Sequence, residues 1–362
     1  IARFPAGMMT IGLLTWAERR FESYAYGGLL VAAFTLGFAV GSSLSTRLFR
    51  TFGSTRVLRV DTVLSAGCML MLAYLPWGFP AAAVLAALIG LTFPPVTPLA
   101  RSLYPHMSEG PRLMKVYSFD AIAQEGIWVF APICAVGIAG LFGPSHVIMV
   151  CAVFVLVGTL RFSSLQALKL YDPRSVAASG ARSGPVPGTV VFFFVIGFFL
   201  VASAAFSEVY VVERFGYQSP VSGLLLALMS VGSIVGGVMF ARRAVTRYSL
   251  AFRMMIVAVG LTTAALSPWL WLLVVGFFLS GAGVAPSFTA MHARIAALVP
   301  SSRTAEVYAF ANTMQLVGLS AGSAVAGIVV SAAPGGTALL VGAGSVAVAT
   351  ILALILGRLD RR

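Results

Sequence analysis

The chain is dominated by a succession of apolar runs, each about 20 residues long. A run of this length crosses the hydrocarbon core of a bilayer as a helix. The runs contain no alternation of polar and apolar positions, which favours helices over the strands of a membrane barrel. The sequence therefore predicts an all-α polytopic membrane protein. Twelve spans are expected, at residues 4–17, 26–48, 57–76, 80–101, 116–141, 146–163, 189–211, 219–241, 250–268, 269–292, 307–331 and 336–357.

Composition supports a surface that faces lipid. Hydrophobic residues make up 59% of the 362 positions and charged residues only 10%. A soluble domain carries about 25% charged residues because its surface must face water. Cys68, Cys134 and Cys151 each fall inside an expected span without paired spacing. They are interpreted as small core residues, and neither a disulfide nor a metal site is expected.

The basic residues lie almost entirely on one side of the expected membrane topology. The formal net charge is +13, and 21 of the 24 basic residues fall in loops or span ends on one side. Only Arg19, Arg20 and Arg214 fall on the other side. This bias predicts that both termini are cytoplasmic, and it accounts for the charge without a nucleic-acid partner. The scarcity of lysine and the excess of Arg, Ala and Gly suggest a GC-rich bacterial genome and thus a bacterial cytoplasmic membrane.

The chain also contains an internal repeat. Residues 28–47 align without gaps on residues 223–242 at an offset of 195, with 8 of 20 positions identical. About two identities are expected between unrelated apolar helices. An offset of 191 then pairs Gly90 with Gly281, and Tyr117 and Gln124 with Tyr308 and Gln315. The copies keep the same orientation, so they predict two six-helix bundles related by a pseudo-twofold axis along the membrane normal. The expected borders are a bundle at 1–163, a cytoplasmic linker at 164–188 and a bundle at 189–362.

Three pairs of glycines recur at a spacing of four residues, which lets helices approach closely. These pairs are Gly37 with Gly41, Gly232 with Gly236, and Gly318 with Gly322. Two interpretations stay open at this point: static packing, or contact at an interface where the two halves move.

Twelve spans, parallel halves, a basic central loop and cytoplasmic termini together resemble the major facilitator superfamily along the whole chain. The stretch from Gly41 to Arg56 matches the glycines and arginines of that family's motif between spans 2 and 3. Arg50, however, stands where the family usually has an aspartate. Phe93-Pro94-Pro95 with Arg101, followed by Tyr117-Ser-Phe-Asp120, resembles actinobacterial members of the efflux type.

This resemblance implies a secondary transporter that works by alternating access, usually as a monomer and without a cofactor. A central substrate site would lie between the halves. Prolines at 94, 95, 98 and 286 predict bends in spans 4 and 10, because proline interrupts the helical hydrogen-bond ladder.

Carboxylates at membrane depth are costly and point to function. Glu125 lies about 13 Å above the cytoplasmic start of its helix, and it is the first candidate for a protonatable coupling residue. The alternative is a structural hydrogen bond to a neighbouring helix. Asp120, nearer the cytoplasm, is interpreted first as a gate or ion pair with Arg101 and second as a coupling residue. Glu208 is expected at the outer mouth. Two further candidate gating residues are Arg47 and Arg56.

A polar stripe marks the candidate substrate site. Tyr117, Asp120, Gln124 and Trp128 recur at steps of three and four residues and so share one face of their helix. Tyr308, Asn312 and Gln315 repeat this pattern in the second half. Hydrogen bonding between helices is the alternative role for such amides. The candidate substrate-binding residues are Gln124, Trp128, Asn312, Gln315, Tyr308 and Trp16.

Other classes of function are disfavoured. His106, His146 and His292 are scattered, and no nucleophile with a base or cluster of metal ligands is evident, so an enzyme is not expected. A phosphate-binding glycine loop is also missing, which argues against a primary pump. The expected function is proton-coupled export of a small amphiphilic or hydrophobic compound. The alternatives are an importer or uniporter of a narrow substrate, and a receptor or channel of the same fold.

Overall fold

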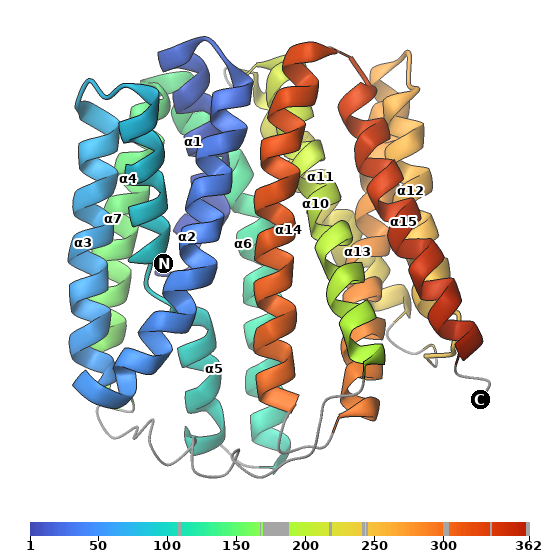
Figure 1. Ribbon diagram of the computed structural model, residues 1–362, viewed down its shortest axis with the longest axis horizontal. Coiled ribbons are helices and arrows are strands. Elements are labelled where there is room, and N and C mark those ends of the chain that lie inside the picture. Colours follow the sequence, from blue (N-terminus) through green and yellow to red (C-terminus); the bar gives the residue numbers. More distant parts are fainter. Residues whose placement is uncertain are drawn as a thin grey trace.

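The computed structural model describes residues 1–107, 110–166, 168, 188–216, 219–240, 243, 245–299, 304–333 and 335–359. Over these residues the fold consists of helices and short connections, without a strand. The helices stand side by side and run alternately up and down (Figure 1). We call the end where α7 stops and α10 begins the linker face. The end where α1 stops and α2 begins is the opposite face.

The first half contains seven helices that make six spans. The second span is joined to the third by a turn at Gly53, and the fifth to the sixth by a turn at Gly143. The helices are α1 (Phe4–Phe21), α2 (Tyr24–Phe52), α3 (Ser54–Tyr74), α4 (Phe79–Leu91), α5 (Val96–Met107), α6 (Gly110–Phe142) and α7 (Pro144–Ser163).

The second half contains six helices. They are α10 (Thr189–Phe215), α11 (Pro220–Phe240), α12 (Ser249–Ala265), α13 (Leu270–Leu298), α14 (Thr304–Ala332) and α15 (Thr337–Leu359). Each half is thus a bundle of six spans, as the sequence predicted. Nine helices within the described residues are long and apolar enough to cross a membrane, while α12 and the apolar part of α6 are shorter.

The fourth span is broken, as its prolines predicted. Helix α4 ends at Leu91 and α5 begins at Val96, so Pro94 and Pro95 lie in the break. The break follows because a proline has no backbone N–H to donate and clashes with the preceding turn. Pro286 behaves differently, since it lies inside the continuous helix α13.

The paired glycines pack helices within each half. A side chain at Gly37 or Gly41 would collide with the backbone of α4, and one at Gly232 or Gly236 with the backbone of α13. Gly318 and Gly322 contact α10 in the same way. Of the two interpretations left open by the sequence, these contacts favour static packing, because each joins helices of a single bundle.

Two other glycines make the contact between the halves. Gly28 on α2 lies against the backbone of Ser323 and Gly327 on α14, and a Cβ there would overlap the Ser323 carbonyl. Gly223, the repeat equivalent of Gly28, lies against Pro132 and Val136 on α6. The α2–α14 and α11–α6 contacts are therefore related by the pseudo-twofold axis.

This seam lies toward the opposite face. Ser320 Oγ donates a hydrogen bond of 2.9 Å to the Ala32 carbonyl, and Tyr24 Oη donates one of 3.3 Å to the Val212 carbonyl. Tyr24 begins α2 and Val212 is near the end of α10, so both belong to the opposite face. The described hydrogen bonds between the halves thus hold them together at that end of the molecule.

Candidate functional site

The predicted polar residues of α14 lie on the side that faces the interior. Gly318 packs on α10 and Ser320 on α2, which marks the two flanks of the helix. Successive residues of a helix are rotated by about 100° around its axis. Asn312 and Gln315 therefore lie on the same arc of the helix, between the side that packs on α10 and the side that packs on α2. The apolar and exposed Phe310 lies on the other arc, as expected for a lipid-facing surface. Asn312 and Gln315 therefore face the space between the halves.

Gln315 is held against α10. A Cβ added at Gly197 would lie 3.4 Å from Gln315 Cγ and 3.5 Å from Met291 Sδ. The side chain of Gln315 thus lies over Gly197 and beside Met291 of α13. Asn312, one turn nearer the linker face, is exposed.

Gln124 on α6 is the repeat equivalent of Gln315. Its Oε1 atom is buried and has no hydrogen-bond partner among the described residues. An acceptor of this kind requires a donor, because an unsatisfied buried polar atom costs about 1–3 kcal/mol. Gln124 thus offers a buried acceptor that no described residue satisfies. The side chains of the other predicted residues on these helices, Asp120, Glu125, Trp128 and Tyr308, lie outside the described part of the structure, as does that of Arg101.

Glu208 lies between the halves. It follows Gly197, Val201 and Ala204 at steps of four, three and four residues, so it shares their face of α10. The Thr10 side chain of α1 lies beside its carboxylate. Thr10 Oγ1 is buried and makes no hydrogen bond of standard geometry with another described residue. The contact is therefore close but not a formed hydrogen bond.

Sequence reasoning placed Glu208 at the outer mouth from its depth alone. Glu208 lies about 28 Å from the start of α10, in agreement with that depth. Depth alone does not tell which way a side chain points around the helix axis. The spacing of eleven residues from Gly197 to Glu208 was the sequence signal that could have shown this direction.

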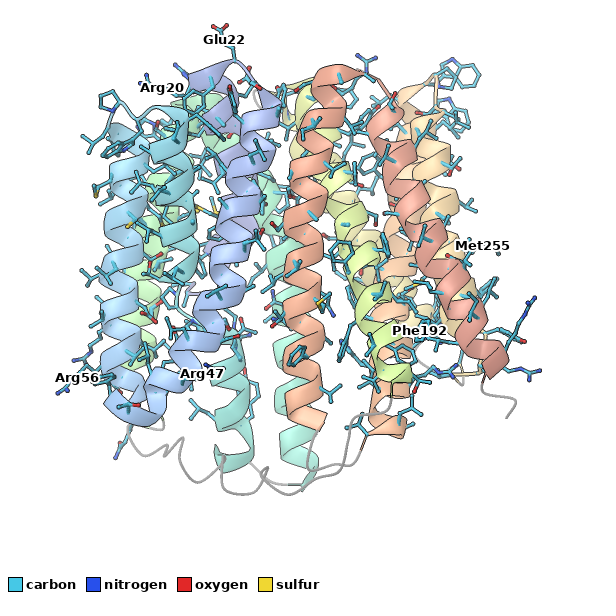
Figure 2. All side chains as sticks on the ribbon, in the orientation of Figure 1. Arg20, Glu22, Arg47, Arg56, Phe192 and Met255 are labelled. Atoms are coloured by element: carbon cyan, nitrogen blue, oxygen red, sulfur yellow. The ribbon has the colours of Figure 1, made fainter. Side chains whose placement is uncertain are left out.

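An aromatic group lines the linker-face part of α10. Phe194 stacks on Phe310 with ring centroids 6.0 Å apart, and the Arg294 guanidinium lies 6.0 Å from the Phe193 ring centroid. Phe192 lies near this end of the helix (Figure 2). These contacts join α10 to α13 and α14 and give this part of the second half an aromatic character.

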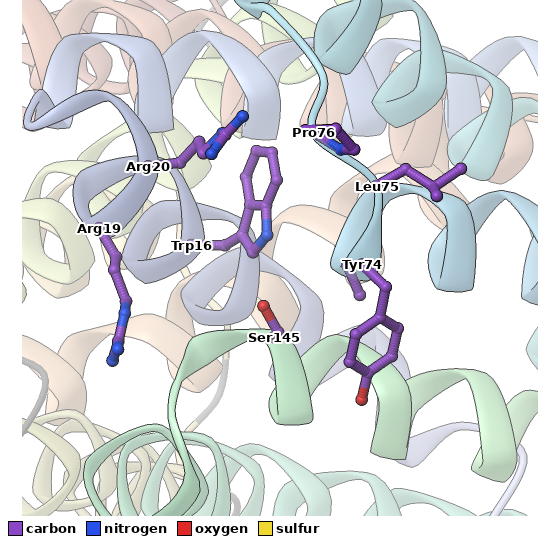
Figure 3. A pocket seen from close by; sticks show the side chains of 8 residues that line it. Trp16, Arg19, Arg20, Tyr74, Leu75, Pro76 and Ser145 are labelled. Carbon is purple, nitrogen blue, oxygen red and sulfur yellow. The ribbon is translucent and has the colours of Figure 1, made fainter.

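Trp16 lies elsewhere than the polar stripe. Its side chain is only 5% exposed and packs edge-on against Phe21, with ring centroids 5.8 Å apart. It lines a cavity at the opposite face of the first half (Figure 3). The structure therefore does not bring Trp16 together with Gln315.

The predicted gating arginines with described side chains are exposed. Arg47 near the end of α2 and Arg56 in α3 both lie at the linker face (Figure 2). Two buried charged side chains, one in each half, were not singled out by the sequence as gates. Asp61 accepts a hydrogen bond of 2.8 Å from Ser45, and Arg253 Nη1 donates one of 2.8 Å to the Pro286 carbonyl.

Comparison with known proteins agrees with this architecture. The family model described as the Major Facilitator Superfamily matches residues 2–267 and 188–362. A point mutant of the nucleoside transporter NupG has a TM-score of 0.74 at 13% identity, with 98% of this chain and 96% of that chain covered. No curated protein sequence matches the chain.

Two other solved structures share the fold. A peptide transporter POT mutant in complex with alafosfalin has a TM-score of 0.67 at 16% identity, covering 100% of this chain and 92% of that one. A bacterial homologue of the iron transporter ferroportin, in an inward-facing state, has a TM-score of 0.61 at 14% identity and 98% coverage of both chains. Because the family model spans the whole chain, the protein belongs to the Major Facilitator Superfamily and is a multi-pass membrane transporter.

Proposed function

We propose that the protein exports a small amphiphilic or hydrophobic compound, driven by protons, through alternating access. The substrate site lies between the halves. Gln124, Gln315 and Asn312 supply its polar contacts, and the aromatic residues of α10 supply apolar surface. Support comes from the composition of this interior, in which three amides and one carboxylate stand among apolar and aromatic side chains. Such a surface suits a ligand with one or two polar groups.

The linker face is the cytoplasmic side in this proposal. The bias of basic residues toward that face supports this orientation and cytoplasmic termini, in a bacterial cytoplasmic membrane. The moving bodies are residues 1–163 and 189–362, connected by residues 164–188, and one chain suffices for transport. The exposed Arg47 and Arg56 are then placed on the side where a cytoplasmic gate closes, with Arg101 and Asp120 as its further candidates.

Glu208 carries the proposed coupling to protons, and Glu125 and Asp120 are further candidates. The observation that carries the proposal is the position of Glu208. Its carboxylate extends from α10 of the second half toward Thr10 on α1 of the first half. When the halves separate at this point, the carboxylate exchanges a protein environment for water. Its proton affinity must change with that exchange, since burial disfavours the charged form. Proton binding is thereby linked to the conformational cycle.

Glu208 and the substrate site share one stripe of α10. Gly197, which contacts Gln315, precedes Glu208 by eleven residues, or about 16 Å along the helix. A rotation or tilt of α10 therefore moves both groups together. This connection lets the protonation state of Glu208 alter the substrate site without direct contact between proton and substrate.

An importer or uniporter of a narrow substrate is the second candidate. The neighbouring structures include transporters of nucleosides, of peptides and a homologue of an iron transporter. The exposed Asn312 favours this alternative, because an exposed amide can recognise a polar substrate. A receptor or channel of the same fold would show no accumulation against a gradient.

Dye accumulation tests the proposal. Cells expressing the chain, with and without a protonophore, are given a panel of amphiphilic cations and neutral dyes. The Glu208→Gln, Glu125→Gln and Asp120→Asn variants are compared at equal expression. Glu22→Gln is the matched control, because Glu22 is exposed at the opposite face (Figure 2). We expect the wild type and the control to lower accumulation several-fold, and the protonophore to abolish this effect.

The variants then assign the coupling residue. Glu208→Gln should remove the dependence on the proton gradient. If Glu208→Gln exports as the wild type does while Glu125→Gln fails, coupling belongs to Glu125. Efflux that ignores the protonophore would contradict proton coupling. Unchanged accumulation of every dye would contradict broad export and favour the importer.

A further inference from the structure

A cavity of about 280 Å³ lies at the opposite face of the first half, away from the seam between the halves. It is formed by the end of α1, the end of α3 with the turn that follows, and the start of α7. Its lining includes Trp16, Arg19, Arg20, Tyr74, Leu75 and Ser145. Because all belong to one bundle, the cavity does not depend on how the halves are placed.

One wall of the cavity is positively charged. Arg20 extends beside the Trp16 ring, and the Ser145 hydroxyl points toward the same ring (Figure 3). Arg19 lies over the turn before α7, since a Cβ at Gly143 would be 3.5 Å from Arg19 Nη1. Ser145 is in the first turn of α7, and that helix start has no side-chain cap. The positive end of the α7 dipole adds to the two guanidinium charges.

The nearby acids are not part of the described lining of the cavity. Glu18 follows Trp16 by two residues, so it lies about 200° around the helix from it, and its charge acts on Arg19. Glu22 follows the end of α1 and is exposed. The described residues that line the cavity include two arginines and no carboxylate. The cavity therefore presents a net positive charge to a ligand.

The remaining wall is largely apolar and partly exposed. Tyr74 is 53% and Leu75 46% exposed, whereas Trp16 is 5% exposed and closes the inner end. Tyrosine and tryptophan at the end of a membrane helix are typical of the level of lipid headgroups. The cavity thus offers donors for an anion on one side and contact for a hydrocarbon chain on the other.

We propose that this cavity binds a phosphate group, with Arg19, Arg20 and Ser145 as its donors. A guanidinium matches the geometry of phosphate oxygens and binds them by charge-assisted hydrogen bonds. The adjoining apolar wall favours an anionic glycerophospholipid of the leaflet at this face over a soluble phosphate. Binding here is separate from transport, because the described lining residues, Trp16 included, all belong to the first half and lie apart from the polar stripe.

Binding to the purified full-length protein in a neutral detergent tests the proposal. Two probes are titrated separately: dihexanoyl-phosphatidylglycerol and inorganic phosphate, with dihexanoyl-phosphatidylcholine as the zwitterionic reference. The variant combines Arg19→Gln with Arg20→Gln. Its matched control is Arg214→Gln, because Arg214 lies 195 residues after Arg19 in the equivalent place of the second half. A second variant, Arg19→Lys with Arg20→Lys, keeps the charge and reports on loss of fold.

We expect the phosphatidylglycerol Kd to rise about tenfold or more in the glutamine variant. The control should bind as the wild type does, and the lysine variant should lie between them. Inorganic phosphate that binds as tightly as the lipid, and is lost in the same variant, would assign a soluble phosphate as the ligand. Equal lipid binding by the wild type and the glutamine variant would overturn the proposal, as would no preference of the wild type for either anionic probe over phosphatidylcholine.

Discussion

Asp61 on α3 and Arg253 on α12 occupy equivalent positions in the two halves, 192 residues apart, and both are buried. The same offset superposes the buried faces of these helices, since Leu58, Met69 and Leu72 correspond to the buried Leu250, Leu261 and Ala264. The residues that contact them are also equivalent, at the offset of 195 that relates residues 28–47 to residues 223–242. Ser45 donates a hydrogen bond to Asp61. Its equivalent is Phe240, whose ring centroid lies 5.2 Å from the Arg253 guanidinium. Equivalent positions of the two halves thus carry a carboxylate in one half and a guanidinium in the other.

These contacts join the second helix to the third in each half. Arg50 stands where the resemblance to the family implies an aspartate between spans 2 and 3. In the described structure, α2 and α3 are connected by the Ser45–Asp61 hydrogen bond. The equivalent helices α11 and α12 are connected by the contact of Arg253 with Phe240.

Replacing Ser45 by alanine should destabilise the first half. The buried Asp61 carboxylate would lose its described hydrogen-bond donor, at a cost of about 1–3 kcal/mol. A thermal unfolding curve of the purified protein would show a lower midpoint for Ser45→Ala. Ser43→Ala is the control, because Ser43 is exposed on the same helix. Equal midpoints for the two variants would show that the hydrogen bond contributes nothing measurable.

Arg253→Lys should be more harmful than its conservative chemistry suggests. Arg253 donates to the Pro286 carbonyl and lies over the Phe240 ring, and a lysine keeps the charge but loses the planar group that makes both contacts. We expect a loss of about 1–3 kcal/mol in the free energy of unfolding. Arg358→Lys, at an exposed position, should leave unfolding unchanged. Thermal unfolding of both variants tests this prediction. An Arg253→Lys protein as stable as the wild type would show that the two contacts of Arg253 do not stabilise the fold.

Much of the fold could be predicted because its rules are local. Span length and hydropathy report on single helices, so the twelve spans were found within a few residues. The break between α4 and α5 follows from the chemistry of Pro94 and Pro95. The relation between the halves could be read from identical residues at fixed offsets, such as Gly28 and Gly223.

The interhelical contacts could not be predicted because they depend on which helices meet. Gly28 and Gly37 are both conserved between the two copies within the sequence, yet Gly28 contacts the other half and Gly37 its own. Depth along the helix predicted only the end of α10 at which Glu208 lies, whereas its rotation toward α1 could be known only from the packing of α10. The hydrogen bond of the buried Asp61 likewise depends on the neighbouring helix, from which Ser45 donates to its carboxylate.

Gly28→Ala should loosen the seam between the halves. The added Cβ would overlap the Ser323 carbonyl, so α2 and α14 must move apart. We expect a loss of about 1–3 kcal/mol in stability and a greater separation at the opposite face. Gly67→Ala is the control, because a Cβ at Gly67 meets nothing within 4 Å.

Spin labels measure that separation directly. Labels at Ser23→Cys and Ala332→Cys, in a protein without the three native cysteines, report the distance between α2 and α14 at the opposite face. The distribution should broaden toward longer distances in Gly28→Ala and stay unchanged in Gly67→Ala. A distribution identical to that of the parent would show that the seam absorbs the extra carbon without opening.

Larger side chains at position 197 should lower the transport rate more strongly than small ones. The Cβ of Gly197→Ala would lie 3.4 Å from Gln315 Cγ, a tight but tolerable contact. A leucine cannot fit there unless Gln315 leaves the face of α10. We therefore expect Gly197→Ala to retain most of the transport rate and Gly197→Leu to lose at least about tenfold, while both remain folded. Transport is measured in proteoliposomes with whichever dye the wild type moves, and folding by monodisperse elution in detergent. A Gly197→Leu protein that transports at the rate of Gly197→Ala would show that Gln315 and its surroundings lie outside the substrate pathway.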